Sequence, residues 1–407
     1  MRTGWKHQKL GEVCDFLNRG ISPKYLSDGG VCVLNQKCVR DHRVNYEPSR
    51  RHDAKAKVVG QERFVRVGDV LVNSTGTGTL GRVAQVREEP DEPTTVDSHV
   101  TIVRPIPGMF HLDFFGYMLV VIEDEIKEAG EGCGGQTELA RATLADRFSV
   151  SYPTALPEQR RIVGILYEAF DGLATATATA EKNLHNARAL FESHLQSVFA
   201  QRGKGWVGRR LEEVLVVQPQ NGWSPPAANH ADSGTPVLTL SAVTGFVFRP
   251  KKIKFTSAVT DSRARYWVWN GDFLITRSNT PELVGHVAIA SGIEKPTIYP
   301  DLIMRMNPDP VKVLTEFLYF QMRTPELRKE ITGRAQGANP TMKKVSNEAV
   351  RTLPICVPPI SEQHRVVDQL DALAAETQHL EFIYQHKLGA LDELKKSLLH
   401  QAFSGEL

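Results

Sequence analysis

The spacing of apolar residues marks two long helices that repeat each other in sequence. The first begins Leu156-Pro-Glu-Gln-Arg-Arg-Ile-Val163 and the second begins Ile360-Ser-Glu-Gln-His-Arg-Val-Val367. Identical residues recur at one offset, from Glu158 and Glu362 (362 − 158 = 204) to Phe199 and Phe403 (403 − 199 = 204). Apolar positions alternate by threes and fours, as in a coiled-coil seam. Because one inserted residue would rotate the following stripe by about 100°, the constant register indicates helices whose length matters.

Shorter elements precede each long helix, in the same order in both halves. Strands are predicted at 31–34, 64–72, 81–84 and 98–103, and again at 237–240, 266–275, 285–288 and 302–306. The Gly-Asp pairs at 68–69 and 271–272 predict a turn between two strands inside the longer runs. Amphipathic helices are predicted at 112–126 and 314–322, each followed by a glycine-rich loop.

This repetition predicts a duplicated fold. We expect an α+β chain with two homologous mixed α/β domains, separated by two long helices packed as an antiparallel coiled coil with pseudo-two-fold symmetry. The predicted segments are 1–152 for the first domain, 153–203 for the central helical spacer, 204–356 for the second domain and 357–407 for the second spacer. Each helix would span roughly 55–60 Å at 1.5 Å per residue. Two separate helices, each in its own core, are the alternative.

Composition is typical of a globular protein with more than one domain. The chain has 407 residues, of which 41% are apolar and 24% charged, and such a length exceeds one ordinary core. No apolar run approaches the roughly 20 residues of a membrane span, and the first residues lack the apolar core of a signal sequence. We therefore expect a cytoplasmic protein with no membrane partner. Its five cysteines form no CxxC pair, which favours reduced thiols over a zinc site.

Positive charge is concentrated in two stretches at equivalent places in the halves. The net charge is only +2, but residues 37–66 contain nine Lys/Arg against four Asp/Glu, and residues 249–265 contain six against one. One such stretch alone could be a solvated loop. Two in equivalent positions favour a surface that faces a polyanion.

Catalytic motifs are absent from the sequence. Gly76-Thr-Gly-Thr-Leu-Gly81 fits the glycine pattern of a dinucleotide site, but a predicted strand follows it where that site needs a helix. There is no P-loop lysine, no HExxH and no GxSxG motif, and Asn339-Pro-Thr-Met342 lacks the second proline and aromatic residue of an amino-methyltransferase motif. Glu158 and Glu362 lie in a first helical turn, where the helix dipole favours a carboxylate. We therefore predict neither a catalytic nor a metal site.

The duplication, the two Glu-Gln helix starts, the Gly-Asp turns and the closing Gln401-Ala-Phe-Ser-Gly-Glu-Leu407 resemble the DNA-specificity subunits of Type I restriction–modification enzymes. The resemblance covers the whole chain, with Ser361 standing where the first copy has Pro157. It implies two target-recognition domains that read a bipartite, asymmetric site on double-stranded DNA, with no catalysis by this chain. It also implies that the helices set the spacer and dock two methyltransferase (modification) subunits, joined by two restriction/translocase subunits. S-adenosylmethionine, ATP and Mg²⁺ would then bind those partners, and no cofactor would bind this chain.

Candidate DNA contacts follow from side-chain chemistry, because base edges favour Arg, Lys, Asn and Gln, while phosphates accept any Lys, Arg, Ser or Thr. Arg277 is the strongest candidate. The predicted set in the first half is Asn35, Gln36, Lys37, Arg40, Arg43, Ser74, Thr75, Arg82, Gln136 and Thr137; in the second half it is Arg249, Lys251, Lys252, Lys254, Arg277, Ser278, Asn279, His286, Asn339, Thr341 and Lys343. The predicted subunit-docking residues at the helix starts are Glu158, Gln159, Arg161, Glu362, Gln363 and Arg365.

Two other functions remain open from sequence. The chain could be a stand-alone DNA methyltransferase or nuclease with an unrecognised site, or a two-domain protein–protein adaptor. Turnover by the chain alone would indicate the first, and DNA affinity that barely depends on salt would indicate the second.

Overall fold

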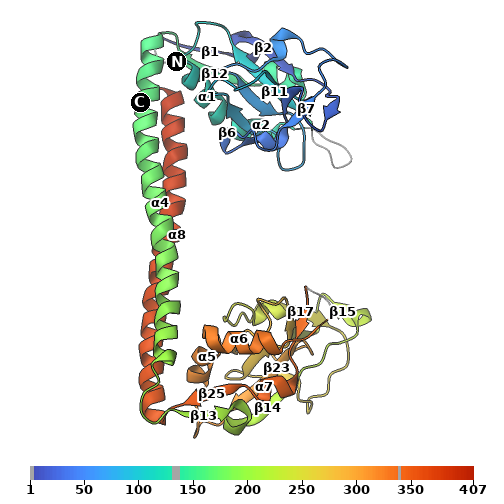
Figure 1. The fold of residues 1–407 in the computed structure, drawn as a ribbon, viewed down its shortest axis with the longest axis vertical. Coiled ribbons are helices and arrows are strands. Elements are labelled where there is room, and N and C mark those ends of the chain that lie inside the picture. The colour runs from blue at the N-terminus through green and yellow to red at the C-terminus, as the bar shows by residue number, and fades with distance from the viewer. Residues whose placement is uncertain (1–3, 131–137, 338–340) are drawn as a thin grey trace. The chain divides into compact units, whose positions relative to one another are not determined.

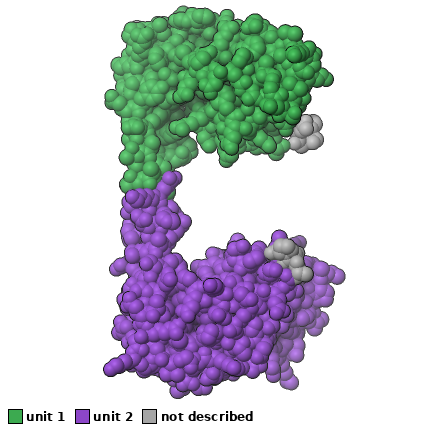
Figure 2. Space-filling view, viewed as in Figure 1, with its two compact units in different colours: residues 1–180, 386–407 green, residues 181–385 purple. Residues whose placement is uncertain are grey.

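A computed structural model describes residues 4–130, 138–337 and 341–407. The chain divides into two compact units (Figure 2): unit 1 comprises residues 1–180 and 386–407, and unit 2 comprises residues 181–385. Each unit contains one mixed α/β domain and parts of two long helices, α4 (Leu156–Ala200) and α8 (Ile360–Ser404). The predicted mixed α/β class with long helices is confirmed, and each long helix has 45 residues.

Unit 1 is built from short strands and three short helices that precede α4 (Figure 1). The strands are β1 (Trp5–Lys9), β2 (Cys14–Arg19), β3 (Tyr25–Leu26), β4 (Val31–Leu34), β5 (Val39–Arg40), β6 (His42–Val44), β7 (Arg50–His52), β8 (Val70–Asn73), β9 (Val83–Gln85), β10 (Thr94–Val96), β11 (Val100–Pro105) and β12 (Ser149–Pro153). The helices are α1 (Leu112–Val121), α2 (Glu123–Glu128) and α3 (Arg141–Asp146). Among the described strands, the largest sheet has the order β2-β11-β8-β9-β6-β5, and a second has the order β10-β4-β7-β3.

Strand β8 shows why the unit has layers. Successive side chains of a strand point to opposite faces, so Val70 and Val72 join the core formed with α1 and α2, while Leu71 joins the core formed with β4 and β10. The central sheet is therefore buried on both faces. This explains why its strands are continuously apolar instead of alternating.

Unit 2 repeats this plan. Its strands are β13 (Val207–Arg210), β14 (Leu215–Asn221), β15 (His230–Ala231), β16 (Thr235–Leu238), β17 (Ile253–Thr256), β18 (Trp267–Val268), β19 (Phe273–Thr276), β20 (Ser278–Asn279), β21 (Val287–Ile289), β22 (Thr297–Ile298), β23 (Ile303–Pro308), β24 (Lys343–Lys344) and β25 (Pro354–Val357). Its helices besides α4 and α8 are α5 (Thr315–Arg323), α6 (Pro325–Arg334) and α7 (Asn347–Arg351). In β19, Phe273 and Ile275 pack with α5 and α6, whereas Leu274 packs in the core on the other face.

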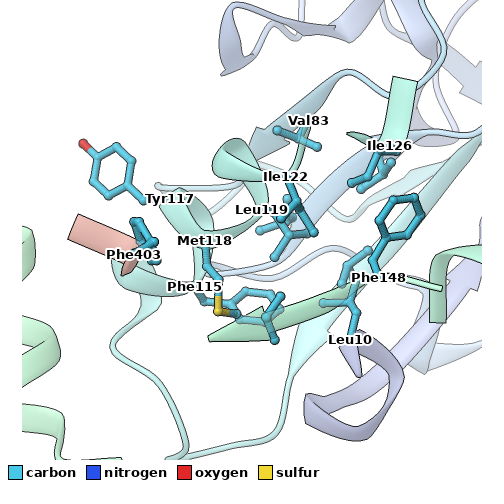
Figure 3. Close-up of a cluster of buried hydrophobic side chains, with 14 of the residues drawn as sticks. Leu10, Val83, Phe115, Tyr117, Met118, Leu119, Ile122, Ile126, Phe148 and Phe403 are labelled. Carbon is cyan, nitrogen blue, oxygen red and sulfur yellow. The ribbon is translucent and has the colours of Figure 1, made fainter. Parts of the chain in front are cut away.

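The two long helices run antiparallel within each unit. In unit 1, Lys395 of α8 lies over the ring of Phe170 of α4, and further along α8 Phe403 packs against Phe114 of α1, with 4.8 Å between ring centroids. Figure 3 shows Phe403 among the side chains of this core. In unit 2, Arg188 pairs with Glu381, and His194 hydrogen-bonds Gln369. In unit 1, Arg161 near the start of α4 also donates to the carbonyl of Leu407, just beyond α8, at 2.9 Å. In both units, therefore, a later residue of α4 meets an earlier residue of the α8 segment.

Several predicted boundaries were wrong for local reasons. The predicted helix 112–126 is broken at Ile122, which separates α1 from α2. The strand predicted at 237–240 ends at Leu238, because Leu240 begins a 3-10 turn. The Gly-Asp turns are confirmed, with Gly68 and Gly271 at positive φ, but the segment before each turn pairs with β10 or β22 and not with the strand after it. The apolar spacing of the second long helix includes Leu391, Leu394 and Leu398, but Leu394 is 48% exposed.

Candidate nucleic-acid interface

A polar segment follows the central strand of each unit and pairs with a segment from far along the chain. In unit 2, β20 runs antiparallel to β24, with Ser278 opposite Lys344 and Asn279 opposite Lys343. In unit 1, Thr75 forms an antiparallel bridge with Glu138, and the Leu139 N–H donates to the Ser74 carbonyl at 2.8 Å. In unit 2 the structure thus brings together two groups of predicted DNA contacts, Ser278 and Asn279 after the central strand and Lys343 after the glycine-rich segment.

The two paired segments differ in chemistry. In unit 1, Glu138 pairs with Arg19 at 2.6 Å, so this negative charge has a partner in its own unit. In unit 2, the Lys343 ammonium donates to the Gly337 carbonyl at 2.9 Å, while Lys344 is exposed. The surface of unit 2 at this place is therefore the more positive.

Arg277 lies beside the paired segments of unit 2 and is only partly exposed. Its Nη1 reaches the Asp301 carbonyl at 3.4 Å, and its buried Nε has no hydrogen-bond partner among the described residues. A guanidinium held by one long hydrogen bond keeps most of its donor capacity for another ligand. The role of Arg277 as a DNA contact therefore remains a prediction.

Three predicted contacts are buried instead. Ser74 is 1% exposed, and its hydroxyl hydrogen-bonds that of Thr101. Ser278 is 1% exposed, and His286 is 8% exposed. Their neighbours in sequence are polar, so the pattern predicted a surface loop, but these side chains point into the domain. In this conformation they are not available to a duplex.

His286 stacks on Phe246, with ring centroids 4.1 Å apart, and its Nδ1 accepts the Gly245 N–H at 2.9 Å. Burial, together with the nearby positive charges of Arg328 and Arg323, lowers the pKa of His286 to about 4. The imidazole is therefore neutral at neutral pH, as an Nδ1 acceptor requires. His286 thus holds Gly245 and Phe246 in place, and these residues precede the predicted basic contacts that begin at Arg249.

Other predicted contacts shape the loops in which they lie. Asn35 caps a 3-10 turn and donates to the Pro48 carbonyl, while Gln36 donates to the Thr75 carbonyl at 2.8 Å. Thr75 in turn hydrogen-bonds His99. The same role is seen for Arg82, which donates to the Gly78 carbonyl, for Asn279, which donates to Thr244, and for Arg249, which donates to the carbonyls of Ser241 and Thr244.

A two-residue hairpin carries the most exposed arginines of the predicted set in unit 1. Arg40 of β5 and Arg43 of β6 lie directly opposite each other. Asp41 and His42 form the turn, with φ of 50° and 58°. Like charges directly opposite each other destabilise a hairpin. Among the described residues, the acid that pairs with these arginines is Asp41, which lies 3.6 Å from Arg40 and is 88% exposed. This arrangement suits an anionic ligand.

The hairpin is anchored by a buried carboxylate. His42 Nε2 lies 3.0 Å from Glu123 Oε2, and Glu123 also pairs with Lys127 at 2.5 Å and accepts the Val83 N–H. Burial alone would raise the pKa of Glu123, but the hydrogen bonds from His42 and Lys127 outweigh it and lower the pKa. No local pattern predicts this anchor, because His42 and Glu123 lie 81 residues apart in the chain (123 − 42 = 81).

The remaining predicted contacts lie at the surface or outside the described residues. Lys37, Lys251 and Lys252 are exposed, and their side chains form no hydrogen bond or ion pair with other described residues. Lys254 lies 3.2 Å from His230, and Thr341 is exposed. Gln136, Thr137 and Asn339 lie outside the described residues.

The helix starts present one exposed pair and one buried glutamine in each unit. Arg161 donates two hydrogen bonds to Glu158, and Arg365 donates two to Glu362, in the same bidentate geometry. Gln159 and Gln363 are both 0% exposed. These glutamines were predicted to dock a subunit, but a fully buried amide cannot contact a partner at the surface. The Glu–Arg pairs can.

Two buried ion pairs were not predicted. Arg104 binds both carboxylate oxygens of Asp69 at 2.7 Å, and Arg305 lies 3.3 Å from Asp272 at the equivalent place in unit 2. The sequence predicted only a turn at each Gly-Asp pair. An arginine lies directly after the predicted strand 98–103 in the first half and within the predicted strand 302–306 in the second, and this repetition could have revealed the pairs.

No group of three or more His, Cys, Asp or Glu side chains is placed to hold a metal ion in the ranges that the structure describes. No described helix is long and apolar enough to cross a membrane.

Solved structures of other proteins share this fold. The chain matches a solved HsdS subunit from Thermoanaerobacter tengcongensis over 100% of its own length and 98% of that chain, with a TM-score of 0.57 and 20% identity. A second structure, described as "Structural basis underlying complex assembly and conformational transition of the type I R-M system", matches over 100% and 99% with a TM-score of 0.78 and 18% identity. The fold is thus one shared with Type I restriction–modification proteins.

The sequence comparisons agree. Residues 203–384 match the family described as Type I restriction modification DNA specificity domain. The EcoKI specificity subunit of Escherichia coli (strain K12) is 25% identical over 199 residues, which is 48% of this chain and 42% of that protein. The EcoEI specificity subunit of Escherichia coli is 23% identical over 172 residues, or 41% and 28%. Each match thus covers less than half of the curated relative. Residues 203–384 thus match the Type I restriction modification DNA specificity domain, in agreement with the resemblance that the motifs predicted.

Proposed function

We propose that this chain is the DNA-specificity subunit of a Type I restriction–modification system and has no catalytic activity of its own. One observation carries the proposal: the same backbone pairing occurs in both units and bears different side chains. Thr75 lies opposite Glu138 in unit 1, whereas Asn279 and Ser278 lie opposite Lys343 and Lys344 in unit 2. Two readers with one backbone and different surface chemistry suit a site made of two different half-sequences.

The long helices have a second role in this proposal. α4 and α8 form one continuous antiparallel coiled coil that relates the domains by a pseudo-two-fold axis and fixes the spacer between the half-sites. The exposed pairs Glu158–Arg161 and Glu362–Arg365 then lie on two equivalent docking surfaces. Two methyltransferase subunits bind there, and two restriction/translocase subunits complete a cytoplasmic complex. S-adenosylmethionine, ATP and Mg²⁺ bind these partners.

Titration of the full chain with DNA duplexes at increasing salt tests the proposal. A protein that makes 6–10 phosphate contacts loses about 10³–10⁵ in affinity between 50 and 200 mM salt. We expect a steep loss of this kind. Weak binding that is flat with salt would support a protein–protein adaptor instead. DNA cleavage or methylation by the chain alone, with Mg²⁺ and S-adenosylmethionine, would identify it as an enzyme.

A further inference from the structure

One buried glutamine in each unit joins the domain to its long helix. In the first turn of α4, Gln159 accepts the His111 N–H at 2.8 Å and donates to the carbonyls of Pro153 at 2.8 Å and Met109 at 3.3 Å. The side chain is 0% exposed. One amide thus connects the end of β12, the start of α1 and the start of α4.

Gln363 makes the same three connections in unit 2. It accepts the Leu314 N–H at 2.8 Å and donates to the carbonyls of Pro358 at 2.9 Å and Lys312 at 3.0 Å. It joins the end of β25, the start of α5 and the start of α8, and it is also 0% exposed. The two units therefore provide two independent examples of one junction.

All of the partner atoms in these junctions belong to the backbone. The residues that supply them differ, with His111 in unit 1 where unit 2 has Leu314, and Met109 where it has Lys312. Side chains in the domains can therefore diverge without changing the junction. A hydrogen bond weakens steeply when its length or angle changes, and a buried amide left unpaired costs about 1–3 kcal/mol. The junction therefore restricts the angle between domain and helix.

We propose that Gln159 and Gln363 are positioning residues that fix the orientation of each DNA-reading domain on its long helix, and thereby fix the spacer length that the chain accepts. The inference rests on the proposed function. One added base pair moves a half-site by about 3.4 Å and turns it by about 35° around the duplex. A domain held at one angle cannot follow that displacement, whereas a domain on a loosened junction can.

Selection from a library of randomised DNA duplexes tests the proposal with the full chain. The wild-type chain is expected to select two half-sites at a single spacer length. Gln159→Met and Gln363→Met keep the side-chain size but remove all three hydrogen bonds. We expect both variants to select the same half-site sequences with a mixture of spacers. Their preference for the original spacer over one a base pair longer or shorter should fall about five- to tenfold.

Matched controls separate orientation from stability. Ile162 and Val366 are buried at equivalent positions of the two helices (366 − 162 = 204) and do not take part in the junctions. Ile162→Ala and Val366→Ala should lower the melting temperature and leave the single spacer unchanged. Spacer mixtures in these controls would reduce the glutamines to an ordinary structural role and overturn the proposal.

Further outcomes are equally decisive. A single spacer in folded Gln→Met variants overturns the proposal. If a Met variant does not fold, Gln159→Glu and Gln363→Glu replace it, since they retain the acceptor and lose both donors; a single spacer there has the same meaning. A wild-type chain that selects no two-part site contradicts the proposed function itself, which is a distinct result.

Discussion

Units 1 and 2 share their buried junctions and differ in their exposed loops. Gln159 and Gln363 make the same three hydrogen bonds, whereas the segment after the central strand faces Glu138 in unit 1 and Lys343 and Lys344 in unit 2. Hydrogen bonds to backbone atoms constrain shape without constraining neighbouring side chains. The comparison teaches that one rigid framework can carry two surfaces of different charge.

The buried ion pairs show a smaller difference in the framework itself. Asp69 is bound twice by Arg104, but Asp272 receives one bond from Arg305, at 3.3 Å, and another from Asn307 at 2.9 Å. Removing one partner of a buried pair leaves an uncompensated charge. The cost should depend on how well the remaining charge is still hydrogen-bonded.

The largest effect is therefore expected from Arg104→Met. It should destabilise unit 1 by about 3–5 kcal/mol, since Asp69 is left buried without a cation. Each aspartate keeps one backbone hydrogen bond, from the Arg66 N–H to Asp69 and from the Trp269 N–H to Asp272. Arg305→Met should cost less, because the Asn307 side chain also still binds Asp272. Hydrogen exchange measured by mass spectrometry can follow each unit separately in both variants. Equal losses would show that hydrogen bonding does not distinguish the two pairs.

Next in size is the loss from Arg277→Ala. Affinity for one half-site should fall by about 1–3 kcal/mol, or roughly 5- to 150-fold, while the other half-site is unaffected. Duplexes with one half-site scrambled at a time measure this. Arg209→Ala, which also removes an arginine from unit 2 but on β13, is the matched control. Equal weakening at both half-sites would contradict independent readers.

A moderate effect is expected from removing both hairpin arginines of unit 1. If Arg40 and Arg43 contact phosphates, Arg40→Ala with Arg43→Ala should lower the slope of log affinity against log salt by about 2. The half-site read by unit 2 should be bound with unchanged sequence preference. An unaltered slope would remove the hairpin from the interface.

The smallest effect concerns pH. His286 has a folded pKa of about 4, below its ordinary value of 6.5, so between these values the unfolded state takes up a proton that the folded state does not. Its contribution to stability is therefore complete above pH 6.5 and is lost as pH falls toward 4.

Arg82 follows the corresponding glycine in unit 1 and should contribute no such pH dependence. Tryptophan fluorescence reports mainly on unit 2, which contains Trp206, Trp223, Trp267 and Trp269. His286→Phe should flatten the pH dependence of its unfolding, and an unchanged curve would contradict this assignment.

Much of the framework was predictable because it repeats. The long helices and the turns at Gly68 and Gly271 follow from periodicity and turn chemistry, which act over a few residues. Exposure of individual loop side chains was not predictable. Ser74 and Ser278 read as surface residues, but each lies where its chain segment is covered by another segment more than 60 residues away. Such pairing between distant segments cannot be predicted from the local sequence.

The predicted docking residues also show that exposure cannot be predicted from local sequence. Glu158 and Gln159 are neighbours in one motif, and sequence alone assigned both to the surface. On a helix, consecutive residues point about 100° apart, so one forms an exposed pair with Arg161 and the other is fully buried. The repetition of the motif was a sound signal of importance, but it did not distinguish a contact for a partner from a joint within the chain.

The division of the chain into units determines the order in which the two units can complete their cores during synthesis. Unit 2 is one continuous segment, 181–385, whereas unit 1 needs residues 386–407 to complete its core. Leu399, Ala402 and Phe403 belong to the same buried cluster as Ile162 and Leu166 of α4. At about 5–20 residues per second, the ribosome adds these last residues tens of seconds after residue 180. The first domain therefore waits with an apolar helix face open while the second is made, and this interval is when a chaperone would be most useful.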